Sequence, residues 1–291
     1  MGKPTIGLAL SSGGARGSEH VGVLKVLDEQ GLDPDIIVGT SMGAQVGGVY
    51  AAGVTVEAME DHWRSVNFAS ACKTLLPTVP WSGWSSGRSL CRFLKSVVSD
   101  QQIEDLTIPF RAVATDLESG SAHVLDRGCL VEAIRASLSV PGLFTPVWID
   151  GRLLIDGGVS NPMPVDVARD LAADVVIAVD VLVEPSEVRI AGIPSIARRE
   201  RNLGIAALPE CENRRFHPSV FAVLFQMSTV FQKRLCEMQL AAHPPDVLIR
   251  PDFSQDPPSY ASVGCGIEAG EAAARAALPD IRRAMGVHNS T

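Results

Sequence analysis

A serine within a glycine-rich turn is the strongest candidate for chemistry in this sequence. Ser41 is the central residue of GTSMG, which follows an apolar segment over 35–39 and precedes a run of small residues typical of a close-packed helix. In a strand–turn–helix context, G-x-S-x-G forms an elbow, because Gly39 and Gly43 permit a strained turn that lifts the hydroxyl above the sheet. The N-terminus of the next helix points N–H groups and its positive dipole end at the same place. The motif therefore predicts that Ser41 is a nucleophile.

A second glycine-rich turn, SGGARG (12–17), lies between an apolar segment and a predicted helix. Its glycines let the backbone expose consecutive N–H groups to an anion. One interpretation is an oxyanion hole with Gly13 and Gly14 as donors, at the same sheet edge as the Ser41 elbow. Arg16 is then either a helper in this loop or an exposed arginine at the start of the helix.

The same turn can also be interpreted as a dinucleotide fingerprint, which would make the protein an oxidoreductase. Ser12, however, stands where the first glycine of that fingerprint belongs. The nearby acids Asp33 and Asp35 precede the second predicted strand, whereas a ribose would be held at its end. Because a nucleophile elbow occupies the next strand–helix turn, the oxyanion-hole interpretation is favoured.

A third glycine turn contains a carboxylate. Asp156 ends a predicted strand and is followed directly by Gly157 and Gly158. An aspartate in such a turn is most often a hydrogen-bonding turn former. Beside a serine elbow it becomes a candidate base, or a residue that orients one.

None of the six histidines has a context that indicates catalysis, although a Ser-His-Asp triad would need one. His20 lies on the apolar face of the first predicted helix, where we expect a packed, hydrogen-bonded side chain. His243 and His288 follow Asp156, as the chain order of α/β-hydrolases requires, yet the elbow of that fold follows a late strand and not the second. The others lie in a charged helix, a strand and an irregular segment: His62, His123 and His217.

Alternating strand and helix patterns position these residues. Apolar runs predict strands at 4–10, 35–39, 111–117, 121–126, 151–158, 172–181 and 246–253. Helical patterns lie between them at 18–30, 42–53, 55–63, 88–98 and 131–138. This alternation predicts an α/β fold with a largely parallel sheet that is covered on both faces.

The chain changes in character after residue 183. Residues 184–217 contain three prolines, six arginines and no clear periodicity, which predicts an irregular connection. Residues 218–291 then close the chain with helices and a strand. We expect one domain over 1–291.

The helix expected at 218–242 carries an apolar stripe at helical spacing. Its members are Val220, Leu224, Met227, Phe231, Leu235 and Met238. The stripe predicts a core-facing surface and not a membrane-lying helix, because the polar face is not rich in lysine.

Composition sets the remaining bounds. The 291 residues are 46% hydrophobic and 20% charged, which indicates a globular chain, and the net charge of −8 argues against nucleic acid as a partner. The six cysteines show no CxxC spacing, so we expect reduced thiols in a cytoplasmic protein.

The N-terminus is too quickly interrupted by glycines to be a signal peptide. The longest apolar run contains Asp174 and Asp180, so we expect a soluble protein, at most peripheral to a membrane.

Five segments in order resemble the patatin-like phospholipases, especially their bacterial members: SGGARGSEHVGVLKVL, VGTSMGA, ATDLESG, RASLSVPGLFTPV and LIDGGVSNPMPV. The resemblance covers about residues 6–183, and five motifs in order are more specific than any one of them. It implies a three-layer α/β/α fold with a mostly parallel central sheet. It also implies a Ser-Asp dyad that works without a catalytic histidine.

The resemblance assigns a role to each motif. It implies that Ser41 is the nucleophile and Asp156 the dyad base. It also implies an oxyanion hole in the Ser12–Gly17 loop, at Gly13, Gly14, Ala15 and Arg16. Ser12 departs from the family's usual first glycine. Because a Cβ restricts positive-φ conformations, we expect this serine to misalign the hole slightly.

The implied activity is that of a serine acyl hydrolase acting on phospholipids or lysophospholipids, with no metal or organic cofactor. The alternative is a lipid-binding or regulatory protein that keeps the fold without hydrolysis. Trp81, Trp84 and the basic cluster Arg198–Arg201 are compatible with peripheral contact with a membrane. Tryptophans packed over the core and a solvated charged loop are the favoured explanations.

Overall fold

An eight-stranded mixed sheet organises the chain in the computed structural model, which describes residues 3–65, 83–184, 220–252 and 263–286. The path through the sheet is β10-β9-β1-β2-β4-β8-β7, with β5 paired to β4. The strands are β1 (Ile6–Leu10), β2 (Ile36–Thr40), β4 (Phe110–Asp116), β5 (Ala122–Leu125), β7 (Val147–Ile149), β8 (Arg152–Asp156), β9 (Val175–Val179) and β10 (Val247–Ile249). A separate pair joins β3 (Gly83–Ser85) to β6 (Gly142–Phe144).

The five strands from β10 to β4 are parallel. Strands β5 and β8 pair antiparallel with β4, and β7 pairs antiparallel with β8. Strands β1 and β9 are buried along their whole length, as expected for a parallel sheet that is covered on both faces. The register pairs Leu10 with Gly39 and Thr40 with Val113. The carboxyl ends of β1 and β2 therefore lie together, beside the middle of β4, which continues to Asp116.

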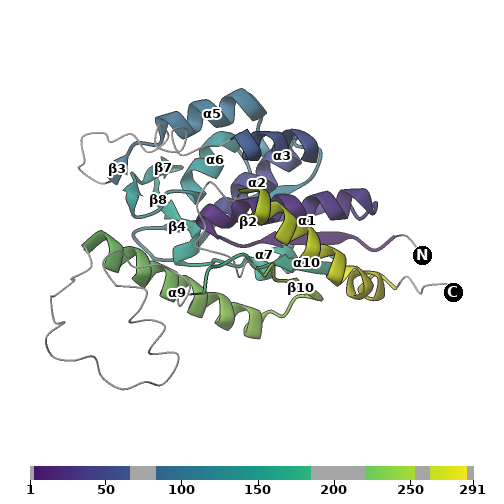
Figure 1. The fold of residues 1–291 in the computed structure, drawn as a ribbon. Helices are drawn as coiled ribbons and strands as arrows, with labels where there is room; N and C mark the ends of the chain where they lie inside the picture. Colours follow the sequence, from purple (N-terminus) through teal and green to yellow (C-terminus); the bar gives the residue numbers. More distant parts are fainter. Residues whose placement is uncertain (1–2, 66–82, 185–219, 253–262, 287–291) are drawn as a thin grey trace, which may run out of the picture.

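Helices cover both faces of this sheet (Figure 1). They are α1 (Gly17–Glu29), α2 (Met42–Ala51), α3 (Val56–Ser65), α5 (Arg88–Val98), α6 (Leu130–Ser137), α7 (Val165–Asp170), α9 (Val220–Ala242) and α10 (Val263–Ala284), with 3-10 turns η1 (Gly14–Arg16), η2 (Ile103–Asp105) and η3 (Gly157–Val159). The predicted three-layer α/β/α class is confirmed.

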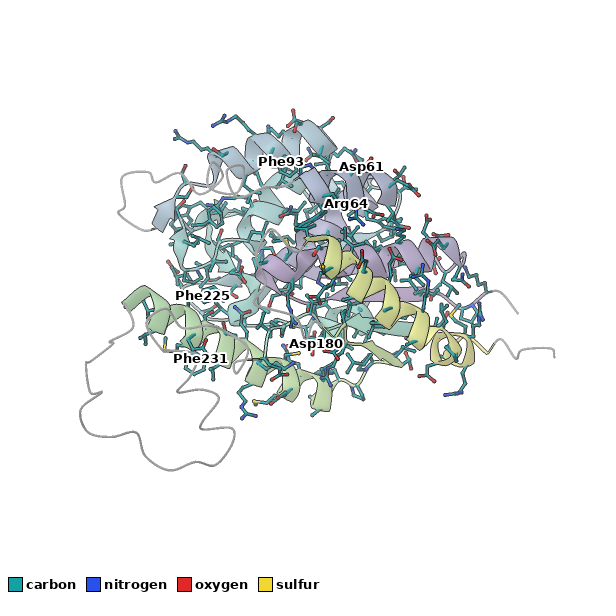
Figure 2. All side chains as sticks on the ribbon, in the orientation of Figure 1. Asp61, Arg64, Phe93, Asp180, Phe225 and Phe231 are labelled. Carbon is teal, nitrogen blue, oxygen red and sulfur yellow. The ribbon has the colours of Figure 1, made fainter. Side chains whose placement is uncertain are left out.

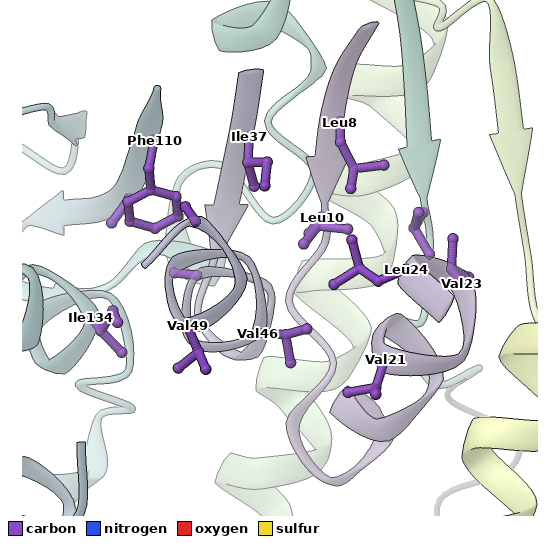
Figure 3. Close-up of a cluster of buried hydrophobic side chains, with 14 of the residues drawn as sticks. Leu8, Leu10, Val21, Val23, Leu24, Ile37, Val46, Val49, Phe110 and Ile134 are labelled. Atoms are coloured by element: carbon purple, nitrogen blue, oxygen red, sulfur yellow. The ribbon is translucent and has the colours of Figure 1, made fainter. Parts of the chain in front are cut away.

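Two hydrophobic cores hold the layers together. The larger core packs Leu8, Ile37 and Phe110 of the sheet against α1, α2 and α6, as Figure 3 shows. The smaller core packs the opposite sheet face, including Val38, against α7 and the buried Cys236 of α9. The elements that carry the candidate site are thus fixed from both sides.

The prediction for the apolar stripe of α9 is wrong for four of its residues. Leu224, Met227, Phe231 and Met238 are 44–68% exposed. The inward face of α9 instead combines Cys236 with polar residues: Lys233 is buried and lies 3.3 Å from an Asp180 carboxylate oxygen. Helical spacing locates a stripe but does not say which side meets the sheet.

Two further predictions fall mainly on residues that the structure does not describe. Of the irregular connection at 184–217, only Glu184 is described, and the Arg198–Arg201 cluster is not. Among the helices of the described segments, none combines the length and the apolar character needed to cross a membrane.

Candidate active site

The turn at Ser41 has the backbone of a strained elbow. Strand β2 ends at Thr40, α2 begins at Met42, and Ser41 between them has φ 55° and ψ −115°. A positive φ is unfavourable for a residue with a side chain and is typical of functional turns. The space around the turn is also restricted at Gly43, because a Cβ there would collide with the carbonyl oxygens of Leu10 and Ser11. The strand–turn–helix geometry expected from GTSMG is therefore present.

Helix α6 holds this elbow in place. The Ser41 amide donates a hydrogen bond to Ser137 Oγ at 2.7 Å, and Ser137 Oγ donates to the Val113 carbonyl at 2.6 Å. The Thr40 hydroxyl donates to the Asn161 carbonyl at 2.8 Å. The strained conformation is thus supported by bonds to three separate elements of the chain.

Ser41 and Asp156 lie in direct contact, although 115 positions separate them in the sequence. Ser41 Oγ donates to Asp156 Oδ2 at 2.6 Å, and the Gly158 amide donates to Asp156 Oδ1 at 2.7 Å. Both side chains are buried, with Ser41 5% and Asp156 1% exposed. One oxygen of the Asp156 carboxylate therefore accepts a backbone hydrogen bond, and the other accepts the hydrogen bond from the Ser41 hydroxyl.

Burial makes this carboxylate more basic than an ordinary aspartate. Desolvation raises the pKa of Asp156 to about 6, against the opposing effect of its hydrogen bonds from Ser41 and Gly158. The group is still mostly ionised at neutral pH. A carboxylate in this state can accept a proton from the hydroxyl it contacts.

The glycine loop after β1 presents free backbone donors at the same sheet edge. Gly13 has φ 179° and ψ −3°, and Gly14 has φ 55° at the start of η1. Within the described residues, the amides of Gly13 and Gly14 form no hydrogen bond to the protein. Ala15 lies in η1 between Gly14 and Arg16. Arg16 is buried, 3.2 Å from Glu19, so its side chain supports α1 rather than sitting exposed at its start.

Ser12 occupies its place in this loop without backbone strain. It is absent from the non-glycine residues with positive φ among the described positions, so the reason for expecting a misaligned hole does not apply. Its hydroxyl instead donates to Gln232 Oε1 of α9 at 2.9 Å. A Cβ on Gly158 would also approach the Gln232 amide within 3.0 Å. Gln232, which no sequence motif marks, therefore lies beside both the glycine loop and the Asp156 turn.

The described histidines lie away from the serine and the aspartate. His20 is fully buried and bonds the Ser11 carbonyl at 3.0 Å, and burial lowers its pKa to about 4, which fits the packed role expected for it. His62 stacks on Phe93 of α5. His123 lies in β5, and His243 is exposed beyond the end of α9. No hydrogen bond links these four to Ser41 or Asp156, and His217 and His288 are outside the described residues.

The acids that a dinucleotide site would need serve other purposes. Asp35 accepts a hydrogen bond from the Ile6 amide at 2.7 Å, at the start of β1 and so at the opposite end from the glycine loop. Asp33 accepts one from the Tyr50 hydroxyl at 3.4 Å. Across the described segments, no three metal-binding side chains of the His, Cys, Asp or Glu type lie together.

A family model matches the part of the chain that carries these residues. The family model of the patatin-like phospholipases matches residues 8–169, which include the glycine loop, the elbow and the Asp156 turn. The chain belongs to the patatin-like phospholipase family.

Relatives of this patatin-like chain occur in bacteria and mammals. An NTE family protein of Mycobacterium bovis is 43% identical over 177 residues, which cover 60% of this chain and 49% of that protein. The human patatin-like phospholipase domain-containing protein 6 is 38% identical over 182 residues, which cover 61% of this chain and 13% of that protein. The crystal structure of VipD from Legionella pneumophila matches 96% of this chain and 67% of its own, with TM-score 0.46 and 13% identity. The chain thus spans half or less of the named mycobacterial and human relatives.

The buried Asp156 carboxylate makes stability depend on pH. Its folded pKa of about 6 lies above the ordinary value of 3.8, so ionisation destabilises the fold as the pH rises through this window. We expect Asp156→Asn to be as stable as the wild type near pH 4 and more stable above pH 6, by up to about 3 kcal/mol. Denaturant unfolding across this range measures the difference, with the exposed Asp61→Asn as control. A stability difference that shrinks with rising pH would contradict the prediction.

Proposed function

We propose that this protein is a serine acyl hydrolase that cleaves acyl esters of lipids, with Ser41 and Asp156 as a catalytic dyad. The observation that carries the proposal is the 2.6 Å hydrogen bond from Ser41 Oγ to a buried carboxylate on a strained elbow. Family membership supports the lipid hydrolase class. Phospholipids or lysophospholipids are the proposed substrates.

In the proposed mechanism the dyad acts as nucleophile and base. Ser41 Oγ attacks the ester carbonyl while Asp156 Oδ2 takes the hydroxyl proton, and Asp156 returns that proton to the leaving alcohol. Water then attacks the acyl-serine by the same route, which releases the fatty acid and restores the serine. Because a carboxylate is a weak base toward a hydroxyl, the oxyanion that forms must be stabilised as it appears.

The free amides of the glycine loop suit that stabilising role. Gly13 and Gly14 lie after β1, next to the β2 elbow, and their N–H groups have no protein acceptor in the described structure. Losing one such donor typically costs about 3 kcal/mol of transition-state stabilisation. The Ser41 amide is unsuited to this role because it is bonded to Ser137.

The exposed face of α9 supports contact with a lipid surface. Phe225 and Phe231 are each 62% exposed on this helix (Figure 2), and Met238 is 68% exposed. The inner side of the same helix contacts the candidate site through Gln232. A helix with its apolar side in the interface would therefore bring the site close to lipid.

The dyad predicts equal effects of its two members. Ser41→Ala and Asp156→Asn should each lower kcat on a short-chain ester by about 10⁴-fold or more, and the double variant should be no worse, because members of such a unit are not additive. Single His→Ala variants should keep their activity wherever circular dichroism shows a folded chain. A folded His243→Ala or His288→Ala enzyme that is as impaired as Ser41→Ala would assign the base to histidine.

The pH–rate profile tests the base directly. Only ionised Asp156 can accept the hydroxyl proton, so kcat/KM for an uncharged ester should rise with pH through an inflexion near the folded pKa of about 6. Activity should therefore be lost, not gained, below this pH. Steady-state kinetics at pH values where the chain stays folded provide the measurement, and a flat profile through this range would exclude Asp156 as the base.

The α9 surface predicts a separation of binding from chemistry. Phe225→Ser/Phe231→Ser should weaken sedimentation with phosphatidylcholine vesicles roughly tenfold, since apolar burial is lost at two positions. Hydrolysis of a dissolved short-chain ester should be unchanged. Arg234→Ser/Glu237→Ser, two exposed polar positions of the same helix, provides the matched control. Equal vesicle binding by both double variants would remove α9 as a lipid contact.

A further inference from the structure

An open pocket of about 540 Å³ lies between α5, α6 and β7, on side chains that the proposed reaction does not use. Arg88, Arg92 and Lys95 line one side, at spacings of four and three residues that place them on one face of α5. Arg135 of α6 and the exposed Trp148 of β7 also line it. None of the lining residues carries a carboxylate, although the whole chain has a net charge of −8.

The cations of this pocket are poorly neutralised by the protein. Within the described residues, Arg88 and Arg92 form no ion pair, and Lys95 pairs with the exposed Asp100 at 2.7 Å. Arg135 is only 3% exposed, yet its hydrogen bonds go to uncharged acceptors: Ser139 Oγ at 2.6 Å, the Thr145 carbonyl at 2.9 Å and the Ser86 carbonyl at 3.1 Å. A buried charge without a counter-charge is unfavourable, so an anion in the pocket would offset its cost.

The charge pattern fits a phosphate group. Guanidinium groups bind phosphate oxygens through paired N–H donors, which makes arginine the residue most suited to phosphate recognition. Helix α5 begins at Arg88, so the positive end of its dipole adds to the same field. Glu132 is a nearby negative charge that opposes this positive field. It lies close enough to interact electrostatically with the pocket residue Cys91, but it does not line the pocket.

The position of the pocket indicates a membrane as the source of that phosphate. Trp148 is 65% exposed, and tryptophan is favoured at the level of lipid headgroups. The β3–α5 junction and β7 lie at the end of the molecule toward which β1 and β2 run, on the left of Figure 1. The N-terminal end of α9 lies at this end too. A membrane there would meet the pocket and the candidate site together.

We propose that this pocket binds the phosphate group of an anionic phospholipid at a membrane surface. The choice of a lipid as the source of the phosphate rests on the proposed lipid hydrolase function. The anion site itself is argued independently of that function. It assigns the enzyme a preference for anionic surfaces that is separate from the catalytic dyad.

Vesicle binding by the full-length Ser41→Ala protein tests the proposal without consuming lipid. We expect binding to vesicles of phosphatidylcholine with phosphatidylglycerol to exceed binding to phosphatidylcholine alone. Arg88→Glu/Arg92→Glu should weaken binding to the anionic vesicles by about 20-fold or more, since each basic residue near such a surface contributes appreciably. Trp148→Ala alone should also weaken binding to the anionic vesicles, although this substitution changes no charge.

Matched controls separate a site from general electrostatics. Arg127→Glu/Arg283→Glu changes the net charge equally at two exposed arginines outside the pocket and should leave vesicle binding nearly unchanged. Equal losses in the two double variants would overturn the proposal. Calorimetry with glycerol 3-phosphate tests whether the phosphate comes from a soluble compound instead. If this compound binds tightly only when Arg88 and Arg92 are present, and vesicle binding is unaffected by Arg88→Glu/Arg92→Glu, the pocket is a site for a soluble phosphate. That result would overturn the lipid assignment.

The test also stands apart from the proposed reaction. In the chain with Ser41 intact, Arg88→Glu/Arg92→Glu should hydrolyse a dissolved ester at the wild-type rate. Absence of ester hydrolysis in the wild type would contradict the proposed function and leave the vesicle result valid. If the double reversal fails to fold by circular dichroism, Arg92→Gln alone should still weaken anionic binding, and an unchanged affinity would overturn the proposal.

Discussion

The hydrogen bond between Ser41 and Asp156 joins residues whose strands are not neighbours in the sheet. Strand β4 lies between β2, which leads into Ser41, and β8, which ends at Asp156. Neighbouring strands are about 4.8 Å apart, so the two side chains meet only if the chain passes close to the middle of β4, where Asp156 pairs with Ala114. Gly157 makes this crossing, since a Cβ there would collide with the Val113 carbonyl of β4. The register of three strands therefore determines the 2.6 Å contact.

This arrangement is costly to the fold, and the surrounding structure compensates locally. A positive φ at Ser41 and a buried carboxylate at Asp156 are both unfavourable. The Ser137 hydroxyl secures the elbow, while the Gly158 amide satisfies the carboxylate oxygen that Ser41 does not contact. Strain and desolvation at such a position are typical of sites selected for chemistry rather than for stability.

Much of the fold and part of the site could be predicted because their signals are local. Apolar runs separated by helical patterns indicate a parallel sheet, and the turns at Ser41 and Asp156 are visible as short motifs on strand ends. The contact of Gln232 with Ser12 could not be predicted, because 220 positions separate them and neither residue type marks a site. The outward stripe of α9 was missed for a related reason: its inner face is held by the Lys233–Asp180 ion pair, which periodicity does not reveal.

Helix α6 and the residues just after it connect the two proposed sites. Arg135 lines the basic pocket, and its guanidinium donates to Ser139 Oγ, while Ser139 Oγ donates back to the Arg135 carbonyl at 2.9 Å. The Ser139 carbonyl accepts the Asp156 amide at 3.0 Å, and Ser137 holds the elbow. A displacement of Arg135 would therefore act on both Ser41 and Asp156 through these hydrogen bonds. Close-packed protein interiors are hardly compressible and transmit small displacements. Helix α6 and the residues just after it therefore support both the proposed phosphate pocket and the proposed catalytic residues.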